Sequence, residues 1–159
     1  MSAADRPGGT QVFTPKDTAF EERVRASFAR QRVMSTIGAQ LGSVSPGEVV
    51  IELPFRADLT QQDGYLHAAI VTAIADSACG YAAHTLLPAG AGILTVEYKV
   101  NFLAPAAGRA FTAYGRVTKP GRTLTVTAGE VVAETDTGPR PVAIMLATMM
   151  TMSGRDNAA

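Results

Sequence analysis

The chain has 159 residues, of which 47% are hydrophobic and 18% are charged. A chain of this length forms one domain with a substantial core, and this composition is too apolar and too weakly charged for an intrinsically disordered protein. Fourteen Lys and Arg residues balance fourteen Asp and Glu residues, so the formal net charge is zero. This balance excludes a general electrostatic attraction to nucleic acids or anionic membranes, and we expect neither as a partner.

The chain has one cysteine, Cys79, and its first residues lack the apolar run of a signal peptide. A lone cysteine cannot form an intramolecular disulfide or a zinc site built from several thiolates, which favours a reducing compartment. We therefore expect a cytoplasmic protein. Residues 1–16 and 153–159 are mostly polar or small, which predicts flexible tails around a single domain over residues 17–152.

The first predicted element is an amphipathic helix, capped by Asp17 or Thr18, in which large apolar residues recur every fourth position. From Ile37 to Pro54 the pattern becomes strand-like, and a Ser-Pro-Gly turn within it predicts a hairpin. The next residues, 55–66, are predicted to form a loop. Its length of about a dozen residues favours a functional role.

The stretch from Leu66 to Leu87 has the length and composition of a helix but only one formally charged residue, Asp76. A surface helix would have a charged face, and a membrane span would not carry a carboxylate at its centre. We therefore expect a helix that protein encloses on most sides. One face is mostly bulky, and the opposite face, which includes Asp76, is small: Ala69, Thr72, Ala73 and Gly80. Such a face allows another backbone to approach closely.

The rest of the chain predicts four strands, separated by turn sequences at hairpin spacing. They are Ile93–Leu103, Phe111–Lys119, Leu124–Ala133 and Val142–Met152. The elements do not alternate between strand and helix, as a parallel sheet would require. We predict an α+β protein with the hot-dog fold, in which a long antiparallel sheet wraps around a central apolar helix and an amphipathic helix lies at the N-terminus.

Asp76 is the main candidate for chemistry, because it lies mid-helix, where it cannot act as a cap, and no Lys or Arg of that helix can pair with it. Backbone N–H groups near Ala68, at the start of the helix, could hold an oxyanion. His67 precedes Asp76 by nine residues, about 13 Å along a helix, so the two cannot act together on one carbonyl. If both serve one site, two subunits must cross along the small-residue face, which predicts an obligate homodimer with two shared sites.

Four sequence features together carry a family resemblance. They are the histidine that starts the helix nine positions before an aspartate, the segments Asp76–Ala83 and Leu94–Ala106, and the Gly121–Thr123 turn. Over Phe20–Met152 the chain resembles the hot-dog acyl-CoA thioesterases of the PaaI type, from phenylacetate degradation. The resemblance implies hydrolysis of an acyl-CoA to a carboxylic acid and CoA, with no cofactor other than the CoA of the substrate. It also implies homodimers, commonly paired into homotetramers.

The resemblance further implies roles for individual residues. Asp76 would be the general base or nucleophile, and the Ala68 N–H would contact the thioester oxygen. Gln61 and Thr95 would orient substrate or water, and His67 would have a supporting role near the thioester. The CoA moiety would contact one strand residue and one turn: Phe102, Lys119, Gly121, Arg122, Thr123 and Leu124. No metal site is implied.

The sequence leaves two other functions open. The family usually has His-Gly-Gly at the helix start, whereas this chain has His67-Ala68-Ala69. The missing glycines favour, as one alternative, a hot-dog protein that binds acyl-CoA without catalysis. The other alternative is a hot-dog dehydratase or hydratase, since such enzymes also pair a histidine with an acid.

Several candidate residues also have purely structural interpretations. Phe102 could be a core aromatic, and the basic turn over residues 119–124 could be a solvated hairpin turn. Cys79 is predicted to be a small buried residue and not a nucleophile. His84, late in the helix, is predicted to interact with the helix dipole.

Overall fold

The computed structural model describes residues 12–153. The helices are α1 (Phe20–Arg30), α2 (Arg32–Ile37), the short 3-10 helix η2 (Ala57–Leu59) and α3 (Ala68–His84). The strands are β1 (Gln40–Ser45), β2 (Glu48–Pro54), β3 (Gly92–Phe102), β4 (Ala110–Lys119), β5 (Leu124–Thr135) and β6 (Gly138–Met152).

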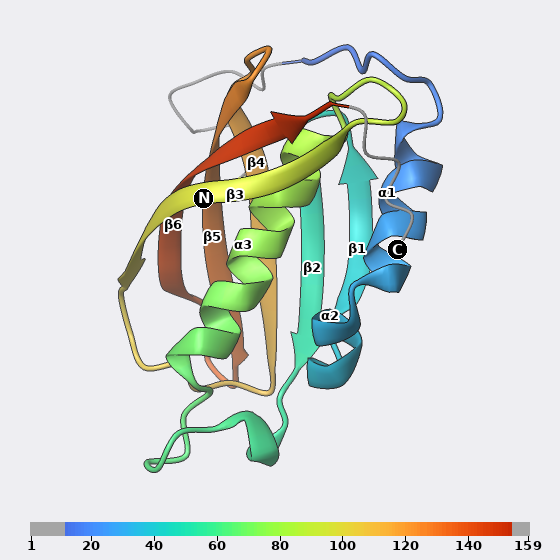
Figure 1. Ribbon diagram of the computed structural model, residues 1–159. Coiled ribbons are helices and arrows are strands. Elements are labelled where there is room, and N and C mark those ends of the chain that lie inside the picture. Colours follow the sequence, from blue (N-terminus) through green and yellow to red (C-terminus); the bar gives the residue numbers. More distant parts are fainter. Residues whose placement is uncertain (1–11, 154–159) are drawn as a thin grey trace.

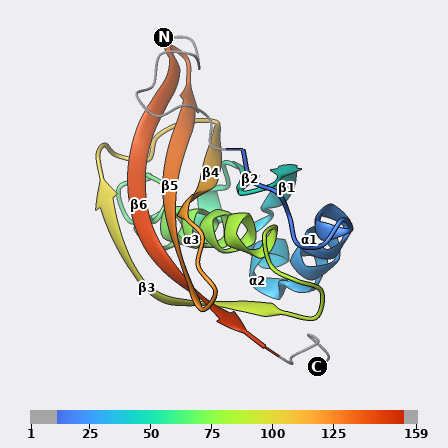
Figure 2. The ribbon, with the colours of Figure 1, turned by 90° about the horizontal axis from the view of Figure 1, so that it is seen from above.

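The predicted α+β class and hot-dog fold are confirmed. The strands form one antiparallel sheet in the order β1-β2-β4-β5-β6-β3 (Figure 1). The sheet curves around α3, which lies on its inner side (Figure 2). In β4 and β5 buried and less buried residues alternate, so each strand turns one row of side chains towards α3. No helix in the described part of the chain is both long and apolar enough to cross a bilayer.

Two glycines let α3 lie close to the sheet. Gly115 of β4 and Gly129 of β5 are partners in register, so they lie side by side beneath the helix. A Cβ added to Gly115 would lie 2.2 Å from the carbonyl carbon of Ala78, and one added to Gly129 would lie 2.9 Å from the sulfur of Cys79. We call this pair the glycine trough. Any side chain there would push the helix away from the sheet.

The two faces of α3 differ as predicted. The face towards the sheet is buried, and Cys79 on it has no exposed surface, which confirms its packing role. Ile70, predicted on the bulky face, is only half-buried because it lies in the first turn of the helix. The small-residue face remains half-buried or exposed: Ala69, Thr72, Ala73, Asp76 and Gly80. The carboxylate therefore lies on the side of α3 that a single chain leaves open.

The N-terminal region differs from the prediction. Neither Asp17 nor Thr18 caps α1: the N-cap is Ala19, and it makes no side-chain capping bond. Residues 32–37 form a second helix, α2, so Ile37, where the strand-like pattern was predicted to begin, ends a helix; Gly38 follows it in a left-handed conformation (φ 79°), and β1 begins at Gln40.

The predicted flexible tails lie mostly on residues 1–11 and 154–159, outside the described residues. Phe13, within the predicted N-terminal tail, packs against the core. Its ring lies over the hairpin glycine Gly47, where an added Cβ would be 2.4 Å from the nearest ring carbon. The domain therefore begins earlier in the chain than the polar composition of this segment indicates.

The last strand begins at Gly138 and not at Val142 as predicted, despite the prolines at 139 and 141. β3 pairs with β6 only as far as Ala143, so both prolines lie where β6 is an edge strand. A proline lacks the N–H that a second neighbouring strand would require, and an edge position tolerates it.

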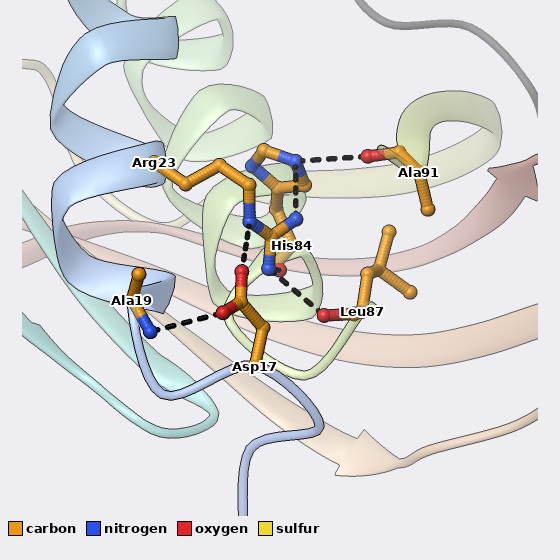
Figure 3. A network of polar contacts seen from close by, with 6 residues as sticks. All are labelled: Asp17, Ala19, Arg23, His84, Leu87 and Ala91. Atoms are coloured by element: carbon orange, nitrogen blue, oxygen red, sulfur yellow. Dashed lines mark hydrogen bonds and ion pairs between the residues drawn. The ribbon is translucent and has the colours of Figure 1, made fainter. Parts of the chain in front are cut away.

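A polar network joins α1 to the C-terminal end of α3 (Figure 3). Arg23 donates hydrogen bonds to Asp17 (3.0 Å) and to the carbonyl oxygen of Leu87 (2.8 Å). His84 is only 2% exposed, and its Nε2 lies 3.2 Å from both an Arg23 nitrogen and the Ala91 carbonyl oxygen. Burial, and then the charge of Arg23, lower the pKa of His84 to about 4. His84, the last residue of α3, is therefore neutral at pH 7, and it does not place a full positive charge at the C-terminal end of the helix dipole.

This network predicts a pH dependence of stability. The ordinary pKa of histidine is 6.5 and that of folded His84 is about 4, so the unfolded chain binds a proton that the folded chain rejects between these values. The stabilising effect of neutral His84 is thus complete above pH 6.5 and is lost progressively as the pH falls towards 4. In urea unfolding across this range, His84→Gln should show a smaller loss of unfolding free energy than the wild type. If the unfolding free energy changed with pH equally in the wild type and in His84→Gln, the lowered pKa of His84 would be contradicted.

Candidate active site

Asp76 pairs with one side chain, that of Thr95 on β3. The Thr95 hydroxyl donates a hydrogen bond of 2.8 Å to Oδ1 of Asp76. Burial raises the pKa of Asp76, and the hydrogen bond from Thr95 acts in the opposite direction. None of the ion pairs among residues 12–153 involves Asp76. The carboxylate is therefore more basic than that of an ordinary aspartate, and no cation of the described residues neutralises it.

One cross-strand row links Thr95 to the predicted CoA turn. Thr95 is the register partner of Met149 on β6, which is the partner of Thr125 on β5. The Thr125 hydroxyl in turn accepts a hydrogen bond of 3.3 Å from the Gly121 N–H. Because neighbouring strands lie about 4.8 Å apart, the row reaches this turn about 10 Å from Thr95. The carboxylate and the turn therefore lie at the same end of the sheet.

The N-terminus of α3 presents a free backbone donor. His67 is the N-cap, and its Nδ1 accepts a hydrogen bond of 3.0 Å from the Ala69 N–H. The Ala68 N–H has no acceptor among residues 12–153, and the residue is exposed. No residue other than glycine has a positive φ in this part of the chain, so Ala68 and Ala69 take the place of glycines here without backbone strain.

Gln61 lies in the loop before α3, which extends beyond the sheet at the bottom of Figure 1. Its backbone N–H donates to the Tyr65 carbonyl oxygen (2.9 Å), and Gly64 closes this turn with a φ of 83°. Its side chain contacts Asp63, accepting from the Asp63 N–H and donating to its carboxylate (3.4 Å). In the single chain Gln61 therefore stabilises the loop tip and makes no hydrogen bond to Asp76 or Ala68.

The candidate residues thus form two groups within one chain. Asp76 and Thr95 are in contact, whereas Gln61, His67 and Ala68 lie around the start of α3. The helix is continuous between Ala68 and Asp76, which places these residues about 12 Å apart along its axis. The Ala68 N–H and the Asp76 carboxylate of a single chain therefore cannot both act on the same thioester group.

The predicted CoA turn is compact and basic. A Cβ on Gly121 would lie 1.9 Å from the carbonyl oxygen of Leu124, so the turn requires glycine. The Thr123 carbonyl oxygen accepts a hydrogen bond of 2.8 Å from the Thr151 N–H, which joins the turn to the end of β6. Lys119 and Arg122 are exposed, and no acidic residue between 12 and 153 pairs with either. Two cations beside exposed turn amides suit phosphate groups.

Phe102, the remaining predicted contact, ends β3 and is 49% exposed, so in the single chain it is not a core aromatic. The sequence did not identify the second neighbour of Thr95, Met149, whose sulfur lies 3.4 Å from the Thr95 hydroxyl. Met149 is fully buried. A bulge between Thr95 and Glu97 shifts the register of β3, and alternation alone cannot locate such a shift.

Comparison with known proteins agrees with the fold. Residues 63–139 match the profile of the thioesterase superfamily. A solved thioesterase family protein from Silicibacter pomeroyi is 50% identical, with a TM-score of 0.84, over 85% of this chain and 99% of that chain. Escherichia coli PaaI, from the phenylacetic acid degradation operon, is 20% identical with a TM-score of 0.77, over 87% of this chain and 97% of its own, and this likeness shows the fold.

A protein of Saccharolobus solfataricus, named as a candidate esterase, is 30% identical over 95 residues, which are 60% of this chain and 67% of that protein. The superfamily match thus covers the end of the loop before α3, α3 itself and the strands β3, β4 and β5, whereas Gln61 lies just before it. The chain belongs to the thioesterase superfamily and is a thioester hydrolase with the hot-dog fold.

Proposed function

We propose that this chain is an acyl-CoA thioesterase of the PaaI type, which hydrolyses an acyl-CoA to a carboxylic acid and CoA at a site shared by two subunits. The observation that carries the proposal is the pair of Asp76 and Thr95. It places a carboxylate of raised pKa, with no cationic partner in the described residues, on the open face of α3. Unpaired, partly buried carboxylates of this kind are typical of catalytic sites.

Two chemical routes are open to Asp76. As a general base, its carboxylate removes a proton from water, and the oxygen of that water attacks the thioester carbon. As a nucleophile, it attacks the carbon itself, and water then hydrolyses the resulting anhydride. In both routes the C–S bond breaks, and the CoA thiolate leaves and takes up a proton. The reaction requires water and no resident metal or redox cofactor.

The oxyanion of either route needs donors, and the N-terminus of α3 provides them. The free Ala68 N–H and the positive end of the helix dipole stabilise negative charge on the thioester oxygen. Gln61 orients substrate or water once its side chain turns from Asp63, and His67 supports the site by fixing the first turn of the helix. Phosphates of CoA bind to Lys119 and Arg122, with the backbone of the same turn.

A second copy of the chain completes this site. The distance of about 12 Å between Ala68 and Asp76 in one chain requires that the donor and the carboxylate of one site come from different subunits. The small-residue face of α3 permits the close helix crossing that this arrangement needs. β3 adds an edge strand with exposed apolar residues, among them Leu94, Val96 and Tyr98, which a partner would cover. We therefore propose a homodimer, with pairing of dimers into a tetramer, acting in the cytoplasm.

The experiment that tests the proposal measures free thiol released from a panel of aryl-acetyl, short-chain and medium-chain acyl-CoA esters by the full chain. We expect release from at least one ester at a rate proportional to enzyme concentration. Tight binding of an acyl-CoA without thiol release would refute the proposal and favour a protein that binds without catalysis. Consumption of an enoyl-CoA without thiol release would instead favour hydratase chemistry.

Subunit mixing tests the shared site directly. Homodimers of Gln61→Ala should hydrolyse poorly, and those of Asp76→Asn should be inactive. When equal amounts of the two are unfolded together and refolded, half of the dimers contain one chain of each kind, and each of these has one site with both residues intact. Activity should then recover to about one quarter of the wild-type value per chain. A mixture no more active than the mean of its components, with mixed dimers verified by mass, would show that each site belongs to one chain.

A further inference from the structure

The Thr95 hydroxyl lies between two acceptors. Its oxygen is 2.8 Å from Oδ1 of Asp76 on one side and 3.4 Å from the sulfur of Met149 on the other. A threonine hydroxyl has a single proton, so it can donate to only one of them at a time. Met149 belongs to the inner face of β6 and has no exposed surface, so its sulfur is fixed in this position by packing.

The protonation state of Asp76 decides which acceptor is used. When the carboxylate is ionised it only accepts hydrogen bonds, so Thr95 donates to it. When the carboxyl group holds a proton, it can donate to the Thr95 oxygen, and the Thr95 proton then needs another acceptor. The Met149 sulfur is at the right distance for this second bond, since a thioether is a weak hydrogen-bond acceptor.

We propose that Met149 is a positioning residue of the active site, whose sulfur lets the Thr95 hydroxyl reverse its direction each time Asp76 gains or loses a proton. The inference rests on the proposed role of Asp76 as the group that takes up a proton during hydrolysis. No proton passes through Thr95. The proton moves from water to Asp76 and then to the departing thiolate, while the hydroxyl of Thr95 only rotates.

Other ionisable groups around Asp76 do not provide the same control. On α3, burial raises the pKa of the Cys79 thiol to about 12, so it stays protonated, and His67 and His84 lie at the ends of the helix. From α1, Arg23 reaches the C-terminal end of α3. The charged residues of β2, β3, β4 and β5 alternate with those that face α3 and lie on the outer face of the sheet: Glu48, Glu52, Glu97, Lys99, Arg116 and Glu130.

Two substitutions should move the acidic limb of the pH–rate curve in opposite directions. Met149→Leu removes the sulfur and nearly keeps the volume, so it weakens only the state in which Asp76 is protonated. The acidic limb then moves to lower pH. Thr95→Val removes the donor to the ionised carboxylate, so it moves the limb to higher pH. A residue that served only to fill space would change the plateau rate and leave the limb where it was.

The matched control is Met145→Leu, since Met145 lies on the same inner face of β6, is 4% exposed, and makes no hydrogen bond through its sulfur within residues 12–153. We would measure kcat against pH for the wild type and the variants, and follow the Asp76 carboxyl carbon by NMR through the same pH range. On the acidic limb, Met149→Leu should retain roughly twice the fraction of its plateau rate that the wild type and Met145→Leu retain. Its KM should be unchanged.

The measurements distinguish failure of the proposed role of Met149 from failure of the proposed thioesterase function. If Met149→Leu titrates like Met145→Leu, the inference is overturned even where hydrolysis is normal. If the wild type releases no thiol, the proposed function fails, and the NMR titration of the carboxyl group still decides whether the sulfur influences it. Met149→Ile provides a second sulfur-free variant in case leucine does not pack at this position.

Discussion

Asp76→Asn is expected to lower kcat by at least about 1,000-fold for any acyl-CoA that the wild type hydrolyses, with KM within about twofold. The amide has the shape of the carboxylate and can still accept the hydrogen bond from Thr95, but it can neither remove a proton from water nor attack the thioester. Thiol release under saturating substrate measures the effect. The control is Asp136→Asn, which makes the same chemical change at an exposed turn between β5 and β6 and should retain wild-type rates.

The pH dependence of the wild type follows from the same group. Burial raises the pKa of Asp76, so activity should fall on the acidic side at a higher pH than an ordinary aspartate would give. The raised pKa also means that the fold favours the protonated form, so ionisation of Asp76 lowers the stability of the folded chain as the pH rises from the pKa of the unfolded chain to the raised pKa of the folded chain, and this loss remains at higher pH. Asp76→Asn should therefore be at least as stable as the wild type at neutral pH. A less stable variant would indicate that the carboxylate serves the fold and not the reaction.

The second large effect is expected at the glycine trough. Gly115→Ala places a Cβ 2.2 Å from the carbonyl carbon and oxygen of Ala78, and backbone atoms cannot give way as a flexible side chain can. The helix must lift or the strand must bend, which should lower the free energy of unfolding by about 3 kcal/mol or more. Urea unfolding monitored by circular dichroism measures the loss.

The control for this substitution is Gly80→Ala on the opposite face of α3, where an added Cβ meets nothing within 4 Å in this chain. Alanine favours a helix over glycine by about 1 kcal/mol, so the chain itself should not be destabilised. If Gly115→Ala were as stable as Gly80→Ala, the close packing of α3 on β4 would be refuted. Sedimentation of Gly80→Ala adds a separate result, since a helix crossing at this face should make the dimer dissociate more readily.

The sequence was most informative about α3 and the strands around it. One charged residue in a long apolar helix, with small residues on the same face, was enough to predict both its burial and its open side. Local contacts near the N-terminus were harder to predict. The Asp17 side chain pairs with Arg23 and does not cap α1, and the residues before Gly38 form a second short helix. The start of β6 was predicted too late because prolines disfavour a strand in the middle of a sheet. Only the pairing pattern shows that this part of β6 is an edge, where prolines are tolerated.

The candidate site was predictable in its residue types but not in its contacts. Asp76 and Thr95 meet because β3 returns beside α3, and the sequence resemblance implied this proximity without its geometry. Met149 could not be identified, since a bulge in β3 sets which residue of β6 faces Thr95. The position of Gln61 depends on loop contacts with Asp63 and Tyr65 that no periodic pattern encodes.

The glycine trough has a consequence for catalysis as well as for packing. Asp76 is held by α3 and Thr95 by β3, so the length of their hydrogen bond depends on how deeply the helix sits in the sheet. That depth is limited by Gly115 and Gly129, where an added Cβ would meet Ala78 and Cys79 of the helix and not the carboxylate. The lack of side chains at these two positions thus helps to set the distance between Asp76 and Thr95. An alanine at either position would shift the helix and so change the distance between Asp76 and Thr95, although neither glycine contacts the carboxylate.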